Sequence, residues 1–91
     1  MVKLILDFSK VKYFSDIHKI IKDTFKFPDY YGENLDALWD CLDYYTDEEL
    51  IIKISGFAII ESRFGDYTSK IKEVFKRASS NFPNIKFEYL S

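Results

Sequence analysis

The sequence is poor in residues on which several classes of protein depend. Among its 91 residues there is one cysteine, Cys41, so no disulfide can form within the chain. This excludes a small disulfide-stabilised secreted scaffold and favours a reducing compartment. The N-terminal sequence MVKLILD is apolar for only a few residues before Asp7, which is too short for a signal peptide or a membrane-spanning helix. We therefore expect a cytoplasmic protein without a membrane segment.

Catalytic and cofactor-binding motifs are equally scarce. The single histidine, His18, has no serine placed near it by the sequence, and we expect it on the solvent-facing side of a helix, without a role. Cys41 has no neighbouring histidine or lysine that would make its thiol reactive, which favours a buried, inert side chain. The three glycines form no loop that could cradle a phosphate. These absences favour a binding protein over an enzyme and predict no cofactor.

Apolar residues, in contrast, are abundant. They make up 47% of the chain and include nine phenylalanines and seven tyrosines, which together can give a chain of this length a hydrophobic core. The sequence contains no internal repeat, linker or low-complexity tract. Residues 1–91 are therefore expected to fold as one domain.

The spacing of the apolar residues predicts an α/β fold. Segments rich in β-branched and aromatic residues predict strands at residues 2–7, 50–55 and 85–89. Apolar residues at helical spacing predict helices at residues 16–25, 35 to about 45, 57–64 and about 67–80. Because long helical crossovers join successive strands, we expect a three-stranded parallel sheet packed with about four helices. The first two strands are expected to be covered on both faces.

Charge is distributed unevenly along the chain. Residues 29–49 contain eight carboxylates and no lysine or arginine, whereas the remaining chain holds seven acids and all thirteen basic residues. The net charge of −2 therefore divides into −8 and +6. Together with a pI of 5.3, this acidic block argues against nucleic acid as a ligand. The block also carries four of the seven tyrosines and the single tryptophan, a composition that favours an interaction surface for a basic protein.

Most of these acids follow Asn34, a suitable N-cap for the second predicted helix. Asp36 lies in the first turn, where the helix dipole favours a carboxylate by about 0.3–1 kcal/mol. Asp40 forms a like-charge i, i+4 pair with Asp36, at a cost of about 0.2–0.5 kcal/mol, and Asp43 and Asp47 follow toward the end where cations are preferred. Folding does not explain these acids, so we expect a site here, with an ordinary solvated face as the alternative. An enzyme with Mg²⁺ held by Asp36 and Asp40 is a further alternative, although no histidine ligand accompanies them.

Aromatic residues accompany the acids. Trp39 is expected at the boundary between the apolar and acidic faces of the helix, where it is either part of the core or an anchor for a partner. Tyr30 and Tyr31 precede the helix in a loop in which Gly32 supplies a positive φ or allows another backbone to come close. This loop and helix together form the predicted interaction surface.

The thirteen-residue run YYGENLDALWDCL, at residues 30–42, resembles the signature of the barstar family of intracellular inhibitors of barnase-type ribonucleases. The likeness continues more loosely through SDIH in the first predicted helix and VFKRA in the last. The resemblance implies the same fold as the apolar pattern. It also implies that the acidic helix and the preceding loop enter the active-site cleft of a basic ribonuclease, where carboxylates occupy the places of RNA phosphates.

The resemblance implies a role for each matching position. Asp40 would be the main phosphate mimic, facing the catalytic and phosphate-binding Arg, Lys and His of the enzyme, and Asp36 would pair with a further basic residue. Tyr30 would cover the active site. The other expected contacts are Gly32, Asn34, Leu35, Trp39, Asp43, Tyr45 and Asp47.

The chain departs from the family pattern at four positions. Tyr45 replaces a tryptophan, Asp47 is a shorter acid, and Asp43 replaces a threonine. Arg77, on the last helix, replaces a glutamate that helps to grip the ribonuclease, and it could pair instead with Glu73 at i, i+4. We predict a ribonuclease inhibitor or immunity protein, monomeric when free. The alternative is a module of the same fold that binds another basic protein.

Overall fold

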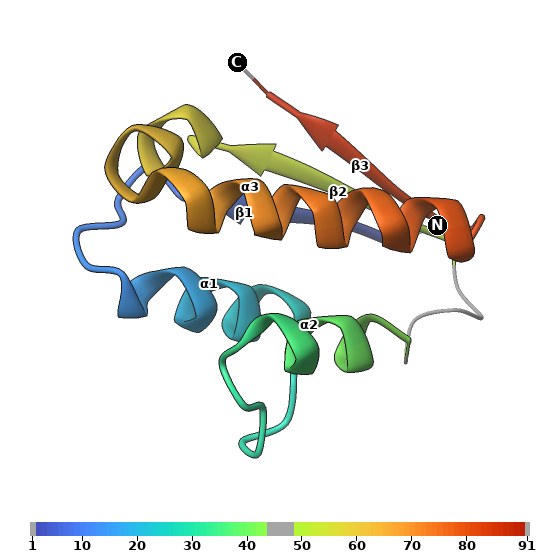
Figure 1. Cartoon of the computed structure of the whole chain (residues 1–91). Coiled ribbons are helices and arrows are strands. Elements are labelled where there is room, and N and C mark those ends of the chain that lie inside the picture. The colour runs from blue at the N-terminus through green and yellow to red at the C-terminus, as the bar shows by residue number, and fades with distance from the viewer. Residues whose placement is uncertain (1, 44–48, 91) are drawn as a thin grey trace.

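The computed structural model describes residues 2–43 and 49–90 and confirms an α/β fold built on three parallel strands (Figure 1). In chain order the elements are β1 (Val2–Asp7), α1 (Ser15–Phe25), α2 (Leu35–Leu42), β2 (Leu50–Ser55), α3 (Phe57–Asn81) and β3 (Ile85–Tyr89). The strands lie in the order β1-β2-β3, so that β2 pairs with both neighbours. The strand ranges are those predicted from the apolar pattern.

Within the described ranges, helices cover one face of this sheet and leave the other open. Along β2, fully buried residues such as Ile52 alternate with half-buried residues such as Ile51. In β1, Leu6 is fully buried whereas its neighbour Ile5 is 63% exposed. Successive side chains of a strand point to opposite faces, so this alternation marks one packed and one open face. The prediction that β1 and β2 are covered on both faces was wrong, because a run of branched residues does not show how many faces are packed.

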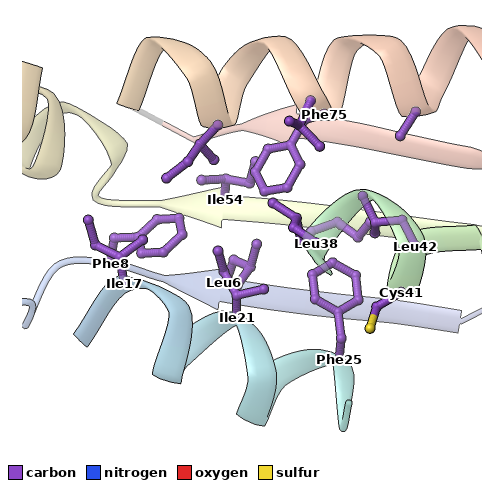
Figure 2. Close-up of a cluster of buried hydrophobic side chains, with 14 of the residues drawn as sticks. Leu6, Phe8, Ile17, Ile21, Phe25, Leu38, Cys41, Leu42, Ile54 and Phe75 are labelled. Atoms are coloured by element: carbon purple, nitrogen blue, oxygen red, sulfur yellow. The ribbon is translucent and has the colours of Figure 1, made fainter. Parts of the chain in front are cut away.

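The packed face and the helices enclose a hydrophobic core (Figure 2). α1 packs against β1, α3 packs against β3, and α2 packs against α3. Fully buried side chains come from every one of these elements and include Leu6, Ile17, Ile21, Leu38, Leu42, Ile54 and Phe75. Burying one such side chain contributes about 1.5–3 kcal/mol to folding. The two leucines of α2 therefore fix which side of that helix faces inward and which remains outside.

Polar side chains set where α1 and α2 begin. Asn34 caps α2 as predicted, because its Oδ1 accepts a hydrogen bond of 2.8 Å from the N–H three residues on. Ser15, expected as the N-cap of α1, is instead the first residue of that helix and makes no cap. Asp16 instead fixes the turn before the helix, since its carboxylate accepts hydrogen bonds from the N–H groups of Tyr13 and Lys12, at 3.0 and 3.2 Å. These bonds lower the pKa of Asp16.

α3 is one long helix where two were predicted. The segments expected as separate helices, 57–64 and 67–80, are joined, with a break in the helical backbone at Gly65, where φ is 37° and ψ is −103°. A positive φ of this kind suits glycine, which has no Cβ to clash. The Thr68 hydroxyl donates a hydrogen bond of 2.6 Å to the Gly65 carbonyl. Three helices therefore occur among the described residues instead of about four, although the kink falls at the predicted boundary.

Candidate partner-binding surface

α2 presents three carboxylates to solvent. Leu38 and Leu42 are fully buried, whereas Asp36, Asp40 and Asp43 are exposed on the other side of the helix. No ion pair involves these three acids within residues 2–43 and 49–90. The described part of α2 therefore carries the acidic stripe that the sequence predicted, with its charges unpaired.

The loop before α2 projects away from the sheet (Figure 1) and presents one tyrosine while burying the next. Tyr30 is 75% exposed, and Tyr31 is buried. The positive φ expected at Gly32 lies instead at Glu33, at 50°. A side chain, and not the expected backbone, comes close to Gly32: a Cβ there would lie 3.1 Å from Nδ2 of Asn34, which donates a hydrogen bond to the Gly32 carbonyl. The loop is thereby closed onto the N-cap of α2.

His18 of α1 joins this loop to α3, a contact that sequence analysis missed. Its side chain, expected in solvent, is only 3% exposed. Its Nδ1 lies 2.7 Å from the Tyr31 hydroxyl, and its Nε2 forms a short hydrogen bond with the Tyr67 hydroxyl. A neutral imidazole satisfies both tyrosines by donating from one nitrogen and accepting at the other. Burial lowers the pKa of His18 and raises the pKa of both tyrosines.

The sequence did contain a signal for this burial. His18 is three residues before Ile21 and seven before Phe25, both of which are buried, so it falls on the inward face of the helix. The hydrogen-bond partners, in contrast, are 13 and 49 residues away along the chain. Only the folded chain brings them together.

A hollow of about 550 Å³ lies between α2 and α3. Its lining on α2 consists of Leu35, Asp36, Trp39 and Asp40, and its lining on α3 consists of Lys70, Glu73, Val74 and Arg77. The structure therefore brings four of the predicted contact residues together on one wall. The opposite wall comes from a helix that supplies two cations.

Trp39 is both a core residue and part of this hollow. The indole is half-buried and packs against the core, with its ring stacked on that of Phe82 at 5.5 Å between centroids and 30° between planes. The guanidinium of Arg77 lies over the same ring, 5.1 Å from its centroid. The suggested ion pair of Arg77 with Glu73 does not form, although both residues are within the described chain. Among the described residues, Arg77 therefore contacts an aromatic ring and pairs with no acid.

Lys70 and Val74 were not foreseen as parts of the surface. The residues of α3 that line the hollow are at positions 70, 73, 74 and 77, the i, i+3, i+4, i+7 spacing of one helix face. Spacing identifies such a face but does not show which element it meets. Tyr45 and Asp47, which were predicted as contacts, lie outside the described residues.

Residues 2–43 and 49–90 show neither a metal-binding cluster nor a membrane-spanning helix. This part of the chain contains no group of three or more His, Cys, Asp or Glu side chains placed to hold a metal ion. Within the same ranges, no helix has the length and apolarity needed to cross a membrane. Cys41 is buried, as predicted, and burial raises the pKa of its thiol.

Comparison with known proteins agrees with this arrangement. The family described as "Barstar (barnase inhibitor)" matches residues 1–90. The Bacillus subtilis (strain 168) protein named "Putative ribonuclease inhibitor YrdF" is 38% identical over 78 residues, which covers 86% of this chain and 86% of that protein. The family description names an inhibitor, which confirms the prediction of a binding protein rather than an enzyme. The resemblance noted in the loop and acidic helix thus extends over nearly the whole length, and the chain belongs to the barstar family.

Proposed function

We propose that this protein inhibits a basic, barnase-type ribonuclease by occupying its active site with α2 and the loop before it. The observation that carries the proposal is the pair of exposed carboxylates, Asp36 and Asp40, which lack ion-pair partners in the described chain. Membership of the barstar family and a relative named as a ribonuclease inhibitor support the choice of a ribonuclease as partner.

In this proposal Asp40 takes the place of an RNA phosphate. A carboxylate accepts charge-assisted hydrogen bonds from arginine, lysine and protonated histidine, the groups with which a ribonuclease holds phosphate. Asp36 is one helical turn earlier on the same side of α2, so it pairs with a neighbouring cation of the same cleft. Within the described chain neither acid has an ion pair to give up on binding, and both new pairs form in a region from which RNA and water are then excluded.

The loop residues complete the contact. Tyr30, with its ring largely in solvent, lies over the mouth of the active site, while Gly32 and Asn34 let the ribonuclease approach the start of α2 closely. Leu35 and Trp39 supply apolar contact beside the acids. The buried hydrogen bond between Tyr31 and His18 holds the loop before the partner arrives, which lowers the entropy lost on binding.

Acids further along the chain complete the negative surface. Asp43, exposed at the end of α2, belongs to the outer part of the proposed interface. Tyr45 and Asp47, which lie outside the described residues, remain proposed contacts. Charges at a rim act mainly on the rate of association. We place the inhibition in the cytoplasm, where the single cysteine stays reduced, with a monomer binding one ribonuclease.

Inhibition of barnase tests the proposal directly. Purified protein should block RNA hydrolysis by barnase at a ratio of one to one, and excess RNA should slow the onset of inhibition because both compete for one site. Binding without inhibition, or inhibition unaffected by RNA, would contradict occupation of the active site. Absence of any binding to barnase or a related basic ribonuclease would remove the ribonuclease as partner.

A second candidate is an immunity or interaction module for a basic protein that is not a ribonuclease. Arg77 favours this candidate, because it places a cation in the hollow where the resemblance implies a glutamate. A basic partner that binds through Asp40, while no ribonuclease is inhibited, would select it.

A further inference from the structure

The hollow between α2 and α3 has walls of opposite character. The α2 wall carries the carboxylates of Asp36 and Asp40, whereas the α3 wall carries Lys70 and Arg77, with Glu73 between them. All five of these side chains belong to exposed residues. A partner that fills the hollow must therefore match negative charge on one side and net positive charge on the other.

Arg77 is the cation best placed to select such a partner. Its guanidinium lies over the ring of Trp39, which is itself stacked on Phe82 and packed against the core, so the charge is positioned by a well-held aromatic surface. A guanidinium attracted to an aromatic ring keeps its positive charge, and it carries five N–H donors. Among residues 2–43 and 49–90, no carboxylate forms an ion pair with it. Within this described part of the chain, its donors are therefore open to a group from outside.

We infer that Arg77 is a specificity-determining residue, which selects a ribonuclease that presents a carboxylate to the α3 wall of the hollow. The inference rests on the proposed function and narrows the class of partner. The partner's cleft is basic opposite Asp36 and Asp40 but carries an acidic side chain opposite Arg77. A carboxylate accepts two parallel hydrogen bonds from a guanidinium, whereas an arginine or lysine at that place meets a like charge.

The charge at this position decides between two kinds of ribonuclease. Where the family pattern has a glutamate, a ribonuclease with a cation opposite it is preferred, and Arg77 reverses that preference without changing the acidic helix. Like charges brought together at an interface disfavour binding. The two kinds of ribonuclease bind α2 in the same way, and they differ in the charge that they present to residue 77 on α3.

Barnase is the probe, because the family resemblance implies a target with a basic active-site cleft. The dissociation constant is measured for the natural sequence, Arg77→Glu, Lys76→Glu and Asp40→Ala. Lys76 is the matched control, because it is exposed on the same helix, changes the net charge equally and does not line the hollow. Arg77→Glu should bind at least tenfold more tightly than the natural protein, and Lys76→Glu should change binding by less than threefold. Asp40→Ala should weaken binding by at least about thirtyfold.

The measurements distinguish a failure of the inference about Arg77 from a failure of the proposed function. If Asp40→Ala weakens binding but Arg77→Glu does not strengthen it, or strengthens it no more than Lys76→Glu, the role of Arg77 is overturned while the proposed function stands. If Asp40→Ala has no effect, the proposed function itself fails. Circular dichroism of each variant establishes that it is folded.

The carboxylate is tested on the partner's side. Barnase variants in which basic residues around the active site are replaced singly by glutamate are measured against the natural protein and Arg77→Glu. At least one replacement should tighten binding of the natural protein tenfold or more and weaken binding of Arg77→Glu. If no replacement shows this reversal, the inferred carboxylate is wrong.

Discussion

α1 and α2 are both amphipathic helices packed into the same core, but their outer surfaces differ. α1 has Asp16 in its first turn and Lys22 in its last, each at the end where the helix dipole favours its charge. α2 has Asp36 in its first turn, continues with Asp40 and Asp43, and has no basic residue in its last turn. The surface of α1 is arranged for stability, whereas that of α2 is not.

The neighbouring ion pair strengthens this contrast. Lys22 of α1 lies 3.4 Å from Asp29, the first acid of the acidic block, so that acid is partly neutralised within the fold. The carboxylates of α2 have no such partner among the described residues. The charges on α2 oppose the dipole of that helix, so folding alone gives no reason for them. The difference between the two helices teaches that charges of this kind indicate a role in binding.

The largest expected effect comes from Asp40. Replacing it by alanine should weaken ribonuclease binding by at least about 2 kcal/mol, the usual threshold for a hot spot. The reason is that cations of the ribonuclease are then buried without a negative charge beside them. The largest losses of this kind are known from barstar itself, so the size is a family expectation. The dissociation constant and the free energy of unfolding are measured together, and stability should change little.

Two variants sharpen the Asp40 prediction. Glu49→Ala removes an exposed acid outside α2, and Lys22→Ala changes the outer surface of α1. Each should alter binding less than threefold. Equal losses for Asp40→Ala and Glu49→Ala would mean that the acidic block acts only as a general attractor.

His18 should have the next largest effect, since it links α1 to the loop before α2. His18→Ala leaves the buried hydroxyl of Tyr31 without its partner and should lower the free energy of unfolding by about 1–3 kcal/mol. Urea unfolding measures this loss. A stability equal to that of the natural protein would show that the two helices do not depend on this contact.

The same histidine predicts a pH dependence. Burial lowers the pKa of His18 from its ordinary value of 6.5, so the unfolded chain takes up a proton first as the pH falls below about 6.5. The free energy of unfolding should therefore decrease in this range, until the folded state is protonated too. His18→Gln should reduce the slope between pH 7.5 and 5.5. Asp7 and Asp16 have lowered pKa values in the folded protein, so the stability that they contribute is lost at lower pH, as the pH falls below about 3.8.

Capping should matter to both helices. Asn34→Ala removes the side-chain acceptor at the start of α2 and should cost about 1 kcal/mol of stability. Asp16→Ala should also destabilise, because two backbone N–H groups of the turn before α1 lose their acceptor. Thermal unfolding measures both. Asn34→Ala should in addition weaken ribonuclease binding, whereas Asp16→Ala should not. This difference would again assign ribonuclease binding to α2 and not to α1.

The smallest effect concerns the acid at the end of α2. Asp43→Asn removes a charge that opposes the helix dipole and should raise the free energy of unfolding by about 0.3–1 kcal/mol. Lys22→Gln at the end of α1 should lower it. Asp43→Asn should also slow association with a basic ribonuclease at low salt. A loss of stability in Asp43→Asn would contradict the conclusion that the charges of α1 favour stability whereas those of α2 do not.

Local patterns predicted most of the fold. The strand ranges, the cap at Asn34 and the break near Gly65 all follow from spacing and from the conformational needs of single residues. The acidic stripe of α2 was equally visible, because helical periodicity places Asp36 and Asp40 opposite Leu38 and Leu42.

What was missed depends on contacts between distant parts of the chain. His18 was placed in solvent because its partners, Tyr31 and Tyr67, come from the loop and from α3. The open face of the sheet was missed because Ile5 looks like any buried isoleucine. Arg77 was assigned to Glu73 on its own helix, whereas packing of α3 against α2 gave it the ring of Trp39.

Trp39 is the only tryptophan in the chain, and it lines the hollow of the proposed interface. Its indole therefore provides an intrinsic fluorescent signal at this place, without any added label. Arg77 and Phe82 both contact the ring, so a change at either of them alters its surroundings. Emission from this one side chain can report the filling of the hollow in real time, at concentrations where tight complexes form and dissociate.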